Sequence, residues 1–219
     1  MNYHVEFDLD FKRNTFPGKF IVIEGIDGSG KTTQAKLVAE KLSNAIATKE
    51  PTDGPIGKLI REGIADFGKL PPSAIQHLLA ADRAVHVEEI RTYLKEGKTV
   101  VSDRYLWSSI PYGLADLDTH PNNTGSVLLS AQSILSMYHQ FVLPDLSIYL
   151  KVPVDVALAR IENMGKEKEM YEHRDKLEKI YEGYEWLVQE FPKEFVVIDG
   201  EQSVEKVTSE ILDRISSIK

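Results

Sequence analysis

The strongest constraint on this chain comes from one glycine-rich octapeptide. It reads Gly25-Ile26-Asp27-Gly28-Ser29-Gly30-Lys31-Thr32 and fits the pattern G-x-x-x-x-G-K-[ST]. Its glycines let backbone N–H groups converge on phosphate oxygens with no Cβ in the way, and a following helix adds its positive N-terminal end. Lys31 is expected to reach the β- and γ-phosphates, and the Thr32 hydroxyl to bind Mg²⁺. The loop predicts binding of a nucleoside triphosphate, and a glycine-rich turn without a ligand is the alternative.

The surroundings of the octapeptide match this prediction, because an apolar run precedes it and a helical pattern follows it. Residues 20–23 are all apolar, which is typical of a strand buried on both faces. Further strands are expected at 45–48, 99–102, 146–150 and 195–198, and helices at 74–95, 127–141, 154–164, 176–191 and 204–218. Strands that alternate with helices indicate an α/β fold with a mainly parallel sheet, helices on both faces and ligands beyond the carboxyl ends of the strands.

The first eighteen residues differ from the rest. Val5, Phe7, Leu9 and Phe11 alternate with polar residues before Pro17-Gly18 interrupts the pattern. A period of two predicts an edge strand or an arm that packs on the domain, with a partner-binding arm as the alternative. We therefore expect an N-terminal extension over 1–18 and one domain over 19–219.

Composition excludes several classes of function. The 219 residues carry 26 Lys+Arg against 34 Asp+Glu, a net charge of −8, so a nucleic-acid-binding protein is not expected. Cysteine is absent, which excludes disulfides and thiolate metal sites. The sequence has no apolar run long enough to span a bilayer and no signal-peptide pattern at its start. The expectation is a soluble, cytoplasmic protein with no membrane partner.

The residues after the expected strand at 99–102 indicate which class of phosphoryl-transfer protein this chain belongs to. The chain lacks the Asn-Lys-x-Asp motif that GTPases use to read the base, and this strand runs into Asp103-Arg104. An Asp there can hold the water shell of Mg²⁺, and an Arg beside it can clamp a second phosphate with two hydrogen bonds. This pairing favours a kinase whose acceptor carries a phosphate. A local surface ion pair is the alternative.

Several stretches together resemble the thymidylate kinase (dTMP kinase) family, a family of P-loop nucleoside monophosphate kinases. They are residues 20–34, Lys49-Glu50-Pro51-Thr52, Leu78-Leu79-Ala80-Ala81-Asp82-Arg83, Asp103-Arg104-Tyr105 with Ser108-Ser109, and Pro144-Asp145-Leu146. They occur in the family's order and approximate spacing. The resemblance implies a P-loop NTPase fold with a mainly parallel five-stranded sheet and a short lid around 165–175.

The resemblance also assigns roles to residues. Arg104 matches the arginine that holds the acceptor monophosphate, and Arg83 the arginine that donates to the thymine carbonyl. Tyr112 matches the aromatic that crowds the 2′ position of the sugar, and Asp27 the acidic residue near the acceptor sugar and Mg²⁺. Arg160 matches the arginine that lies on the adenine ring. The nucleotide-binding set is then Gly25, Ile26, Asp27, Gly28, Ser29, Gly30, Lys31, Thr32, Thr33 and Arg160, with Thr32 and Asp103 for the metal.

The residues by themselves leave other readings open. Arg83 could form an ion pair on a helix surface with Asp82 or Glu88, and Tyr112 could serve in core packing.

Family members place a basic residue either in the phosphate loop or in the lid. Position 29 is Ser29, so the resemblance points to a lid cation, chosen among Lys166, Lys168 and Arg174, which would neutralise charge on the transferred group. The candidate catalytic residues are Lys31, Asp27, Arg104, Asp103, Lys168 and Arg174.

Three positions depart from the family pattern. Lys49 stands where Arg is usual, Leu79 replaces an aromatic that stacks on thymine, and Gly113 replaces a polar residue. The hydroxyls of Ser108 and Ser109 could supply base-edge hydrogen bonds or cap a helix. The candidate acceptor-binding residues are Lys49, Pro51, Leu79, Arg83, Arg104, Ser108, Ser109, Tyr112 and Tyr171.

The expected reaction is transfer of the γ-phosphoryl group of ATP, with Mg²⁺, to dTMP, which gives dTDP and ADP. Other acceptors, namely dUMP, another nucleoside monophosphate or a nucleoside, remain open, as does a non-catalytic nucleotide-binding module, which Lys49 and Leu79 would fit. The family also implies a homodimer.

Overall fold

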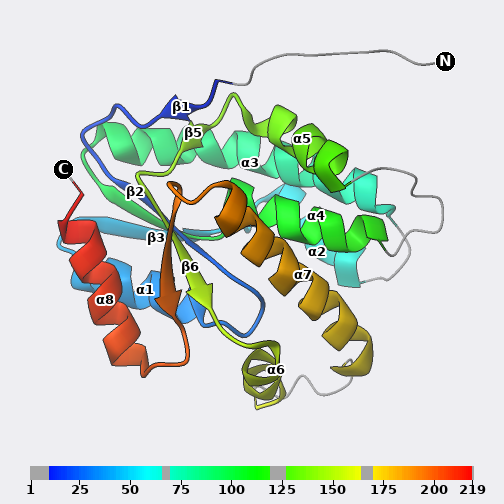
Figure 1. Cartoon of the computed structure of the whole chain (residues 1–219). Coiled ribbons are helices and arrows are strands. Elements are labelled where there is room, and N and C mark those ends of the chain that lie inside the picture. Colours follow the sequence, from blue (N-terminus) through cyan, green and yellow to red (C-terminus); the bar gives the residue numbers. More distant parts are fainter. Residues whose placement is uncertain (1–9, 66–69, 119–126, 164–169, 219) are drawn as a thin grey trace.

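A single five-stranded parallel sheet forms the centre of the molecule in the computed structural model, which describes residues 10–65, 70–118, 127–163 and 170–218 (Figure 1). The strands are β2 (Phe20–Glu24), β3 (Ala45–Lys49), β4 (Thr99–Asp103), β6 (Leu146–Lys151) and β7 (Phe195–Asp199). They lie in the order β3-β4-β2-β6-β7, and every neighbouring pair is parallel. All five carboxyl ends therefore meet at one edge, with β2 between the two halves of the sheet.

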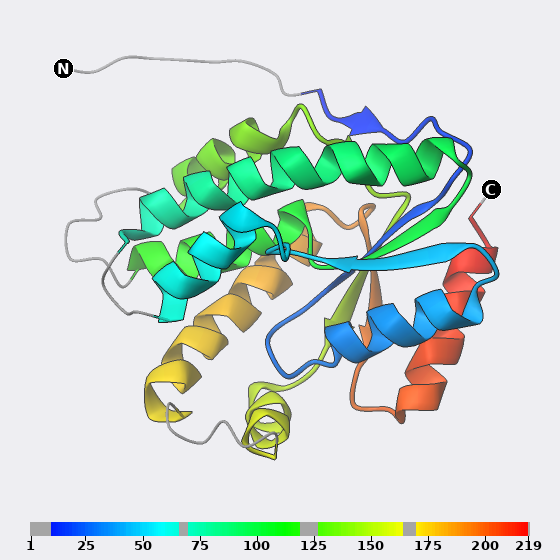
Figure 2. The ribbon, with the colours of Figure 1, turned by 180° about the vertical axis from the view of Figure 1, so that it is seen from behind.

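Helices cover both faces of this sheet. They are α1 (Lys31–Lys41), α2 (Pro55–Ala65), α3 (Pro72–Lys95), α4 (Ser109–Asp118), α5 (Val127–Tyr138), α6 (Val154–Glu162), α7 (Met170–Glu190) and α8 (Val204–Ser216), with a short 3₁₀ turn η1 (Leu106–Ser108). Apolar side chains of α1 and α8 pack on one face, and those of α3, α4, α5 and α7 on the other (Figures 1 and 2). The two clusters bury β2 on both sides, which explains its unbroken apolar run.

The phosphate loop joins β2 to α1 and depends on its glycines. Gly30 is the N-cap of α1 with φ 98°, a left-handed conformation that favours glycine. Gly28 has φ 80°, and a Cβ there would lie 2.4 Å from the carbonyl oxygen of Ala157 on α6. The loop is therefore held in a tight turn whose free N–H groups open at the carboxyl edge of the sheet.

The sequence patterns predicted this architecture well. All five expected strands are present, and so are the helix after the loop and the five further expected helices. Their ends agree within three residues, except that α7 begins at Met170, six residues before the expected start. The patterns did not predict α2 and α4. Both helices contain residues that weaken a helical pattern, namely Gly57 and Gly63 in α2 and Pro111 and Gly113 in α4.

The N-terminal segment contributes one short strand. Within it, β1 (Lys12–Arg13) pairs in parallel with β5 (Val142–Leu143), outside the main sheet. Val5, Phe7 and Leu9 of the predicted alternating pattern lie outside the described residues, so the division of the chain near residue 18 stays a prediction. In the part of the chain that the structure describes, no helix is long and apolar enough to cross a membrane.

Candidate active site

The carboxyl edge of the sheet gathers most of the residues that the sequence singled out. The phosphate loop follows the central strand β2, Lys49 ends β3 and is followed by Glu50 and Pro51, and Asp103 ends β4 and is followed by Arg104. On the other side of β2, α6 follows β6 and carries Arg160. The loop therefore lies between two groups of polar residues, one on the side of β3 and β4 and one on the side of β6 and β7.

Lys31 begins α1 and points back into the phosphate loop. Its ammonium group donates to the carbonyl oxygen of Ile26 at 2.7 Å and lies 4.0 Å from the Asp27 carboxylate. Burial and the neighbouring charge of Arg104 lower the pKa of Lys31 to about 8. A bound anionic phosphate would favour the charged form of Lys31, so the position of this lysine suits phosphate binding.

Thr32 and Asp103 form the candidate metal site. The Thr32 hydroxyl donates to Oδ2 of Asp103 at 2.5 Å, and Oδ1 of Asp103 is buried with no partner among the described residues. An unpaired buried carboxylate oxygen beside a hydroxyl fits Mg²⁺, which prefers oxygen ligands. Within the described ranges no cluster of three or more His, Cys, Asp and Glu could hold a metal. A cation bound here would need phosphate oxygens or water as its other ligands.

Arg104 has an unusual backbone and a crowded side chain. Its φ is 72°, the only positive value among the described residues other than glycine. The guanidinium donates from Nη2 to Asp27 at 2.5 Å and to the Tyr112 hydroxyl at 2.6 Å, and from Nη1 to Ser108 at 3.2 Å. It also lies over the Tyr112 ring, 4.6 Å from the centroid. Instead of pairing with its neighbour Asp103, Arg104 bridges the end of β4 to the phosphate loop.

Asp27 completes this arrangement from the loop. Its side chain is 59% exposed and also accepts a hydrogen bond from the Tyr112 hydroxyl at 3.1 Å. Partial burial raises the pKa of Asp27, but the charges of Arg104 and Lys31 outweigh that effect and hold it well below its usual range. Asp27 is therefore ionised at neutral pH and neutralises part of the cationic charge around it.

Arg83, on α3, is the second arginine of the motif and is 2% exposed. Its Nε and Nη2 contact Oε2 of Glu50 at 2.8 and 2.7 Å, Nη2 donates to the carbonyl oxygen of Tyr105 at 3.0 Å, and Nη1 donates to the Ser109 hydroxyl at 3.1 Å. Arg83 thus makes three hydrogen bonds to described residues and a further close ion-pair contact from Nη2, and its second Nη1 hydrogen has no partner among them. The partner of Arg83 is thus Glu50, and neither Asp82 nor Glu88.

Glu50 is the buried partner that the sequence reasoning missed. It follows β3, precedes Pro51 through a cis peptide bond, and accepts on Oε1 from Nδ1 of His86 at 2.9 Å. Nε2 of His86 in turn lies 2.7 Å from the Thr48 hydroxyl. Burial acts to raise the pKa of Glu50, but Arg83 and His86 outweigh it and lower that pKa. A carboxylate shared by two buried groups fixes the loop after β3 against α3.

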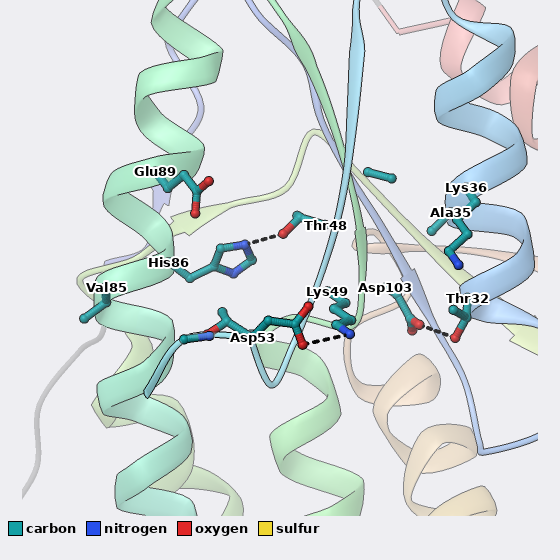
Figure 3. A pocket seen from close by; sticks show the side chains of 13 residues that line it. Thr32, Ala35, Lys36, Thr48, Lys49, Asp53, Val85, His86, Glu89 and Asp103 are labelled. Carbon is teal, nitrogen blue, oxygen red and sulfur yellow. Dashed lines mark hydrogen bonds and ion pairs between the residues drawn. The ribbon is translucent and has the colours of Figure 1, made fainter. Parts of the chain in front are cut away.

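A cavity of about 600 Å³ lies along β3, between α1 and α3 (Figure 3). Its walls include Thr32 and Asp103 on one side and His86 on the other. Lys49 faces it and pairs with Asp53 at 3.0 Å. The cavity therefore adjoins the candidate metal site, and Lys49 is part of its lining.

Arg160 stands on the opposite side of the loop. Its Nη2 donates to the carbonyl oxygen of Gly200 at 2.9 Å, and its Nη1 lies 3.5 and 3.4 Å from the carbonyl oxygens of Gly28 and Ser29. It is held between the phosphate loop and the residue after β7, where the adenine of a bound nucleotide is expected from the resemblance.

The remaining candidates are spread over α3, η1 and α4. Ser109, the first residue of α4, accepts from Arg83 and from the Tyr138 hydroxyl at 3.0 Å, so its Oγ is engaged in the core. Leu79 is half-buried on α3, one turn before Arg83. Among the lid candidates, Arg174 pairs with Asp155 at 2.6 Å and Glu178 at 3.3 Å. Lys166 and Lys168 lie outside the described residues, as does the side chain of Tyr171.

Comparisons with known proteins agree with this geometry. The family model described as thymidylate kinase matches residues 23–211. A probable thymidylate kinase of Methanococcus maripaludis (strain C7) is 44% identical over 204 residues, which cover 90% of this chain and 94% of that protein. One of Thermococcus kodakarensis is 38% identical over 212 residues, with 91% and 98% covered. Among solved structures, the thymidylate kinase of Candida albicans is similar with a TM-score of 0.74 and 28% identity, covering 91% of this chain and 92% of that one.

Proposed function

This chain belongs to the thymidylate kinase family, and from that membership we propose that it transfers the γ-phosphoryl group of Mg·ATP to dTMP, giving dTDP and ADP. The observation that carries the proposal is the bridge from Arg104, at the end of β4, to Asp27 in the phosphate loop. This bridge puts a guanidinium suited to an acceptor phosphate directly beside the loop suited to the donor phosphates.

Catalysis in this arrangement consists of positioning and charge neutralisation. The attacking atom is an oxygen of the acceptor phosphate, which is already anionic, so the reaction needs no strong general base. Lys31 and the N–H groups of the loop would hold the β- and γ-phosphates, while Arg104 holds the acceptor phosphate and keeps the two anions close. Mg²⁺, held by Thr32 and Asp103, would neutralise charge on the transferred group.

Binding of the two bases would involve the flanking arginines. Arg160 lies where a cation can cover adenine, and the free Nη1 hydrogen of Arg83 can donate to a carbonyl of the acceptor base. The Tyr112 hydroxyl, held by Asp27 and Arg104, lies beside the phosphate clamp, where an acceptor sugar would follow the phosphate. This is consistent with selection of a deoxyribose.

Acceptors other than dTMP form a second candidate function. Leu79 offers no aromatic face for the base, and the Candida albicans relative is described with a broad substrate specificity. The base preference is therefore proposed as thymine first, with dUMP and other monophosphates as weaker acceptors.

A coupled assay of ADP release tests these proposals with dTMP, dUMP, UMP, AMP, CMP, GMP and thymidine as acceptors. Release with dTMP above all others is the expected result. Release with thymidine but not with dTMP would mean a nucleoside kinase. ATP binding without release for any acceptor would mean a non-catalytic module.

The family resemblance supports three further proposals. We propose a homodimer, which light scattering tests by mass, and a cytoplasmic location. We also propose a lid around 165–175 that supplies a cation to the transferred phosphoryl group, with Arg174 and Lys168 as the candidates. Alanine at each position separately, compared in kcat, identifies which one acts.

A further inference from the structure

Glu24 is a buried acid that the proposed chemistry does not use. It is the last residue of β2, it directly precedes Gly25 of the phosphate loop, and its exposed fraction is 0%. The four residues before it in the strand are apolar and equally buried. A carboxyl group in such a place destabilises the fold unless it is fully hydrogen-bonded, so its contacts should reveal its purpose.

The contacts of Glu24 come from three different elements. Oε1 accepts from the backbone N–H of Tyr105, at 3.0 Å, in the turn after β4. Oε2 contacts the Ser108 hydroxyl, in η1, and the Tyr184 hydroxyl, on α7, at 2.9 Å. Ser108 Oγ and Tyr184 Oη are themselves 2.8 Å apart. Three oxygen atoms therefore form a closed ring in which every pair lies within hydrogen-bond distance.

Counting hydrogens in this ring gives the state of the carboxyl group. Three O···O contacts need three hydrogens, and the two hydroxyl groups supply two. A proton on Glu24 supplies the third, so that each oxygen donates once and accepts once. Burial raises the pKa of Glu24 even though the Arg104 guanidinium and the hydrogen bonds act to lower it. The neutral acid is thus the form that satisfies the ring.

This ring holds the residue that we assign to the acceptor phosphate. Nη1 of Arg104 donates to Ser108 Oγ at 3.2 Å, and the next N–H along the backbone, that of Tyr105, donates to Glu24. The N–H of Arg104 donates to the carbonyl oxygen of Ile23 at 3.0 Å, and its carbonyl oxygen accepts from Ser102 at 2.6 Å. The left-handed conformation of Arg104, which is strained in a residue other than glycine, is thereby held by hydrogen bonds of its N–H, its carbonyl oxygen and its side chain.

The third member of the ring is delivered by α7. Tyr184 is fully buried and stacks on Tyr149, with 5.1 Å between ring centroids. Its neighbour Gly183 touches α4 so closely that a Cβ there would lie 2.9 Å from Cα of Pro111. The helix cannot turn or slide at this point without moving α4, and it carries Arg174, a candidate lid cation, ten residues earlier. Tyr184 therefore links α7 to the hydrogen-bonded groups around Arg104.

We propose that Glu24, as a neutral acid, and Tyr184 are positioning residues that close a hydrogen-bonded ring with Ser108 and so aim Arg104 at the acceptor phosphate. This inference rests on the proposed function, since it gives Arg104 its ligand. It adds that Glu24 and Tyr184 position Arg104 through Ser108 and the turn after β4.

Steady-state kinetics on four variants test the proposal. Glu24→Gln keeps an oxygen that accepts from the Tyr105 N–H and places an NH2 group with two N–H donors at the ring, where it can donate to both hydroxyls. Its KM for dTMP should therefore stay within about threefold of wild type. Glu24→Leu removes the ring and should raise that KM by about tenfold or more, and Tyr184→Phe, which loses one hydroxyl, by about three- to tenfold, with the KM for ATP little changed in both. Tyr149→Phe is the matched control, because its hydroxyl contacts Glu185 outside the ring, and it should behave as wild type.

Two results would overturn the proposal. One is a Tyr184→Phe enzyme with the wild-type KM for dTMP, and the other is a Glu24→Gln enzyme as impaired as Glu24→Leu, which would mean that the carboxylate has to be charged. If Glu24→Leu fails to fold, Tyr184→Phe and infrared spectroscopy decide. A carbonyl band of a protonated carboxyl group should be present at neutral pH in wild type and absent from Glu24→Gln. A wild-type enzyme that does not phosphorylate dTMP would count against the proposed function and leave the infrared result to judge the ring.

Discussion

The two arginines that we propose for the acceptor, Arg83 and Arg104, have sharply different surroundings. Arg83 is enclosed between α3 and the loop after β3, paired with the buried carboxylate of Glu50. Arg104 stands at the end of β4, and its carboxylate partner, Asp27, is mostly exposed. One guanidinium belongs to the core, and the other is held by groups that a ligand can reach.

The two carboxylate partners hold their arginines in different ways, and each way suits a different ligand. Glu50 pairs with Arg83 inside the core, and the one Nη1 hydrogen without a described partner would suit a single hydrogen bond to a neutral carbonyl. Arg104 donates to Asp27 and Tyr112. Because the Asp27 carboxylate is mostly exposed, an incoming phosphate can take its place without leaving a buried carboxylate unpaired. Arg83 is thus expected to matter for stability, and Arg104 for turnover.

The largest expected effect is the loss of acceptor use in Arg104→Ala. Two or more charge-assisted hydrogen bonds to a phosphate are worth about 3–5 kcal/mol, so kcat/KM for dTMP should fall by about 10³-fold. ATP binding, measured by calorimetry, should persist. Turnover that survives this change would contradict the assignment of Arg104 as the phosphate clamp.

Removing Arg83 should affect stability most. Arg83→Met leaves Glu50 buried with only His86 as a partner, which should lower the free energy of unfolding by about 3–5 kcal/mol, as read from urea denaturation. Arg104→Ala should change it by less than about 1 kcal/mol, because Asp27 is exposed. The double change Arg83→Met with Glu50→Gln should recover part of the loss. Equal destabilisation by the two arginine variants would remove the contrast between the sites.

The pH dependence of ATP binding tests whether Arg104 acts on the donor side as well. Lys31 has a pKa of about 8 in the free protein, and a bound phosphate favours its charged form. Binding should therefore take up a proton above pH 8 but not at pH 6.5, and affinity should weaken as the pH rises through 8. Calorimetry in buffers of different ionisation enthalpy measures this uptake. Because the charge of Arg104 depresses that pKa, Arg104→Ala should move the transition to higher pH.

The smallest effect concerns the backbone of Arg104. At φ 72° a glycine is unstrained, so Arg104→Gly should be as stable as Arg104→Ala or more stable by up to about 1 kcal/mol. At an ordinary helix or strand position, by contrast, a glycine variant is less stable than an alanine variant. A glycine variant clearly less stable than the alanine variant would mean that the turn after β4 carries no strain.

The sequence predicted the strands and the polar residues at their ends, because both are local. A buried parallel strand is an apolar run, and Asp103-Arg104 directly follows one. The parallel topology then brings these ends to one edge, so the cluster could be foreseen without coordinates. Arg104 belongs to this cluster, whereas Arg83 lies within a helix and was singled out only by the resemblance to the family.

What holds the arginines could not be predicted. Glu50 meets Arg83 across 33 positions of sequence, and Tyr184 meets Glu24 across 160. Glu50 precedes a proline, Glu24 precedes the phosphate loop, and Tyr184 lies in a helix. Nothing in the local sequence of these residues indicates which partner each one is buried against. Such pairings depend on how helices dock on the sheet, which is a property of the packed molecule.

The strand order has one further consequence. The residues that we propose for the acceptor lie at or after the ends of β3 and β4, and the residue that we propose for the donor base lies on α6, after β6, with β2 as the shared boundary. Acceptor preference can therefore drift, or be engineered by grafting loops on one half of the sheet, while recognition of ATP on the other half is inherited unchanged.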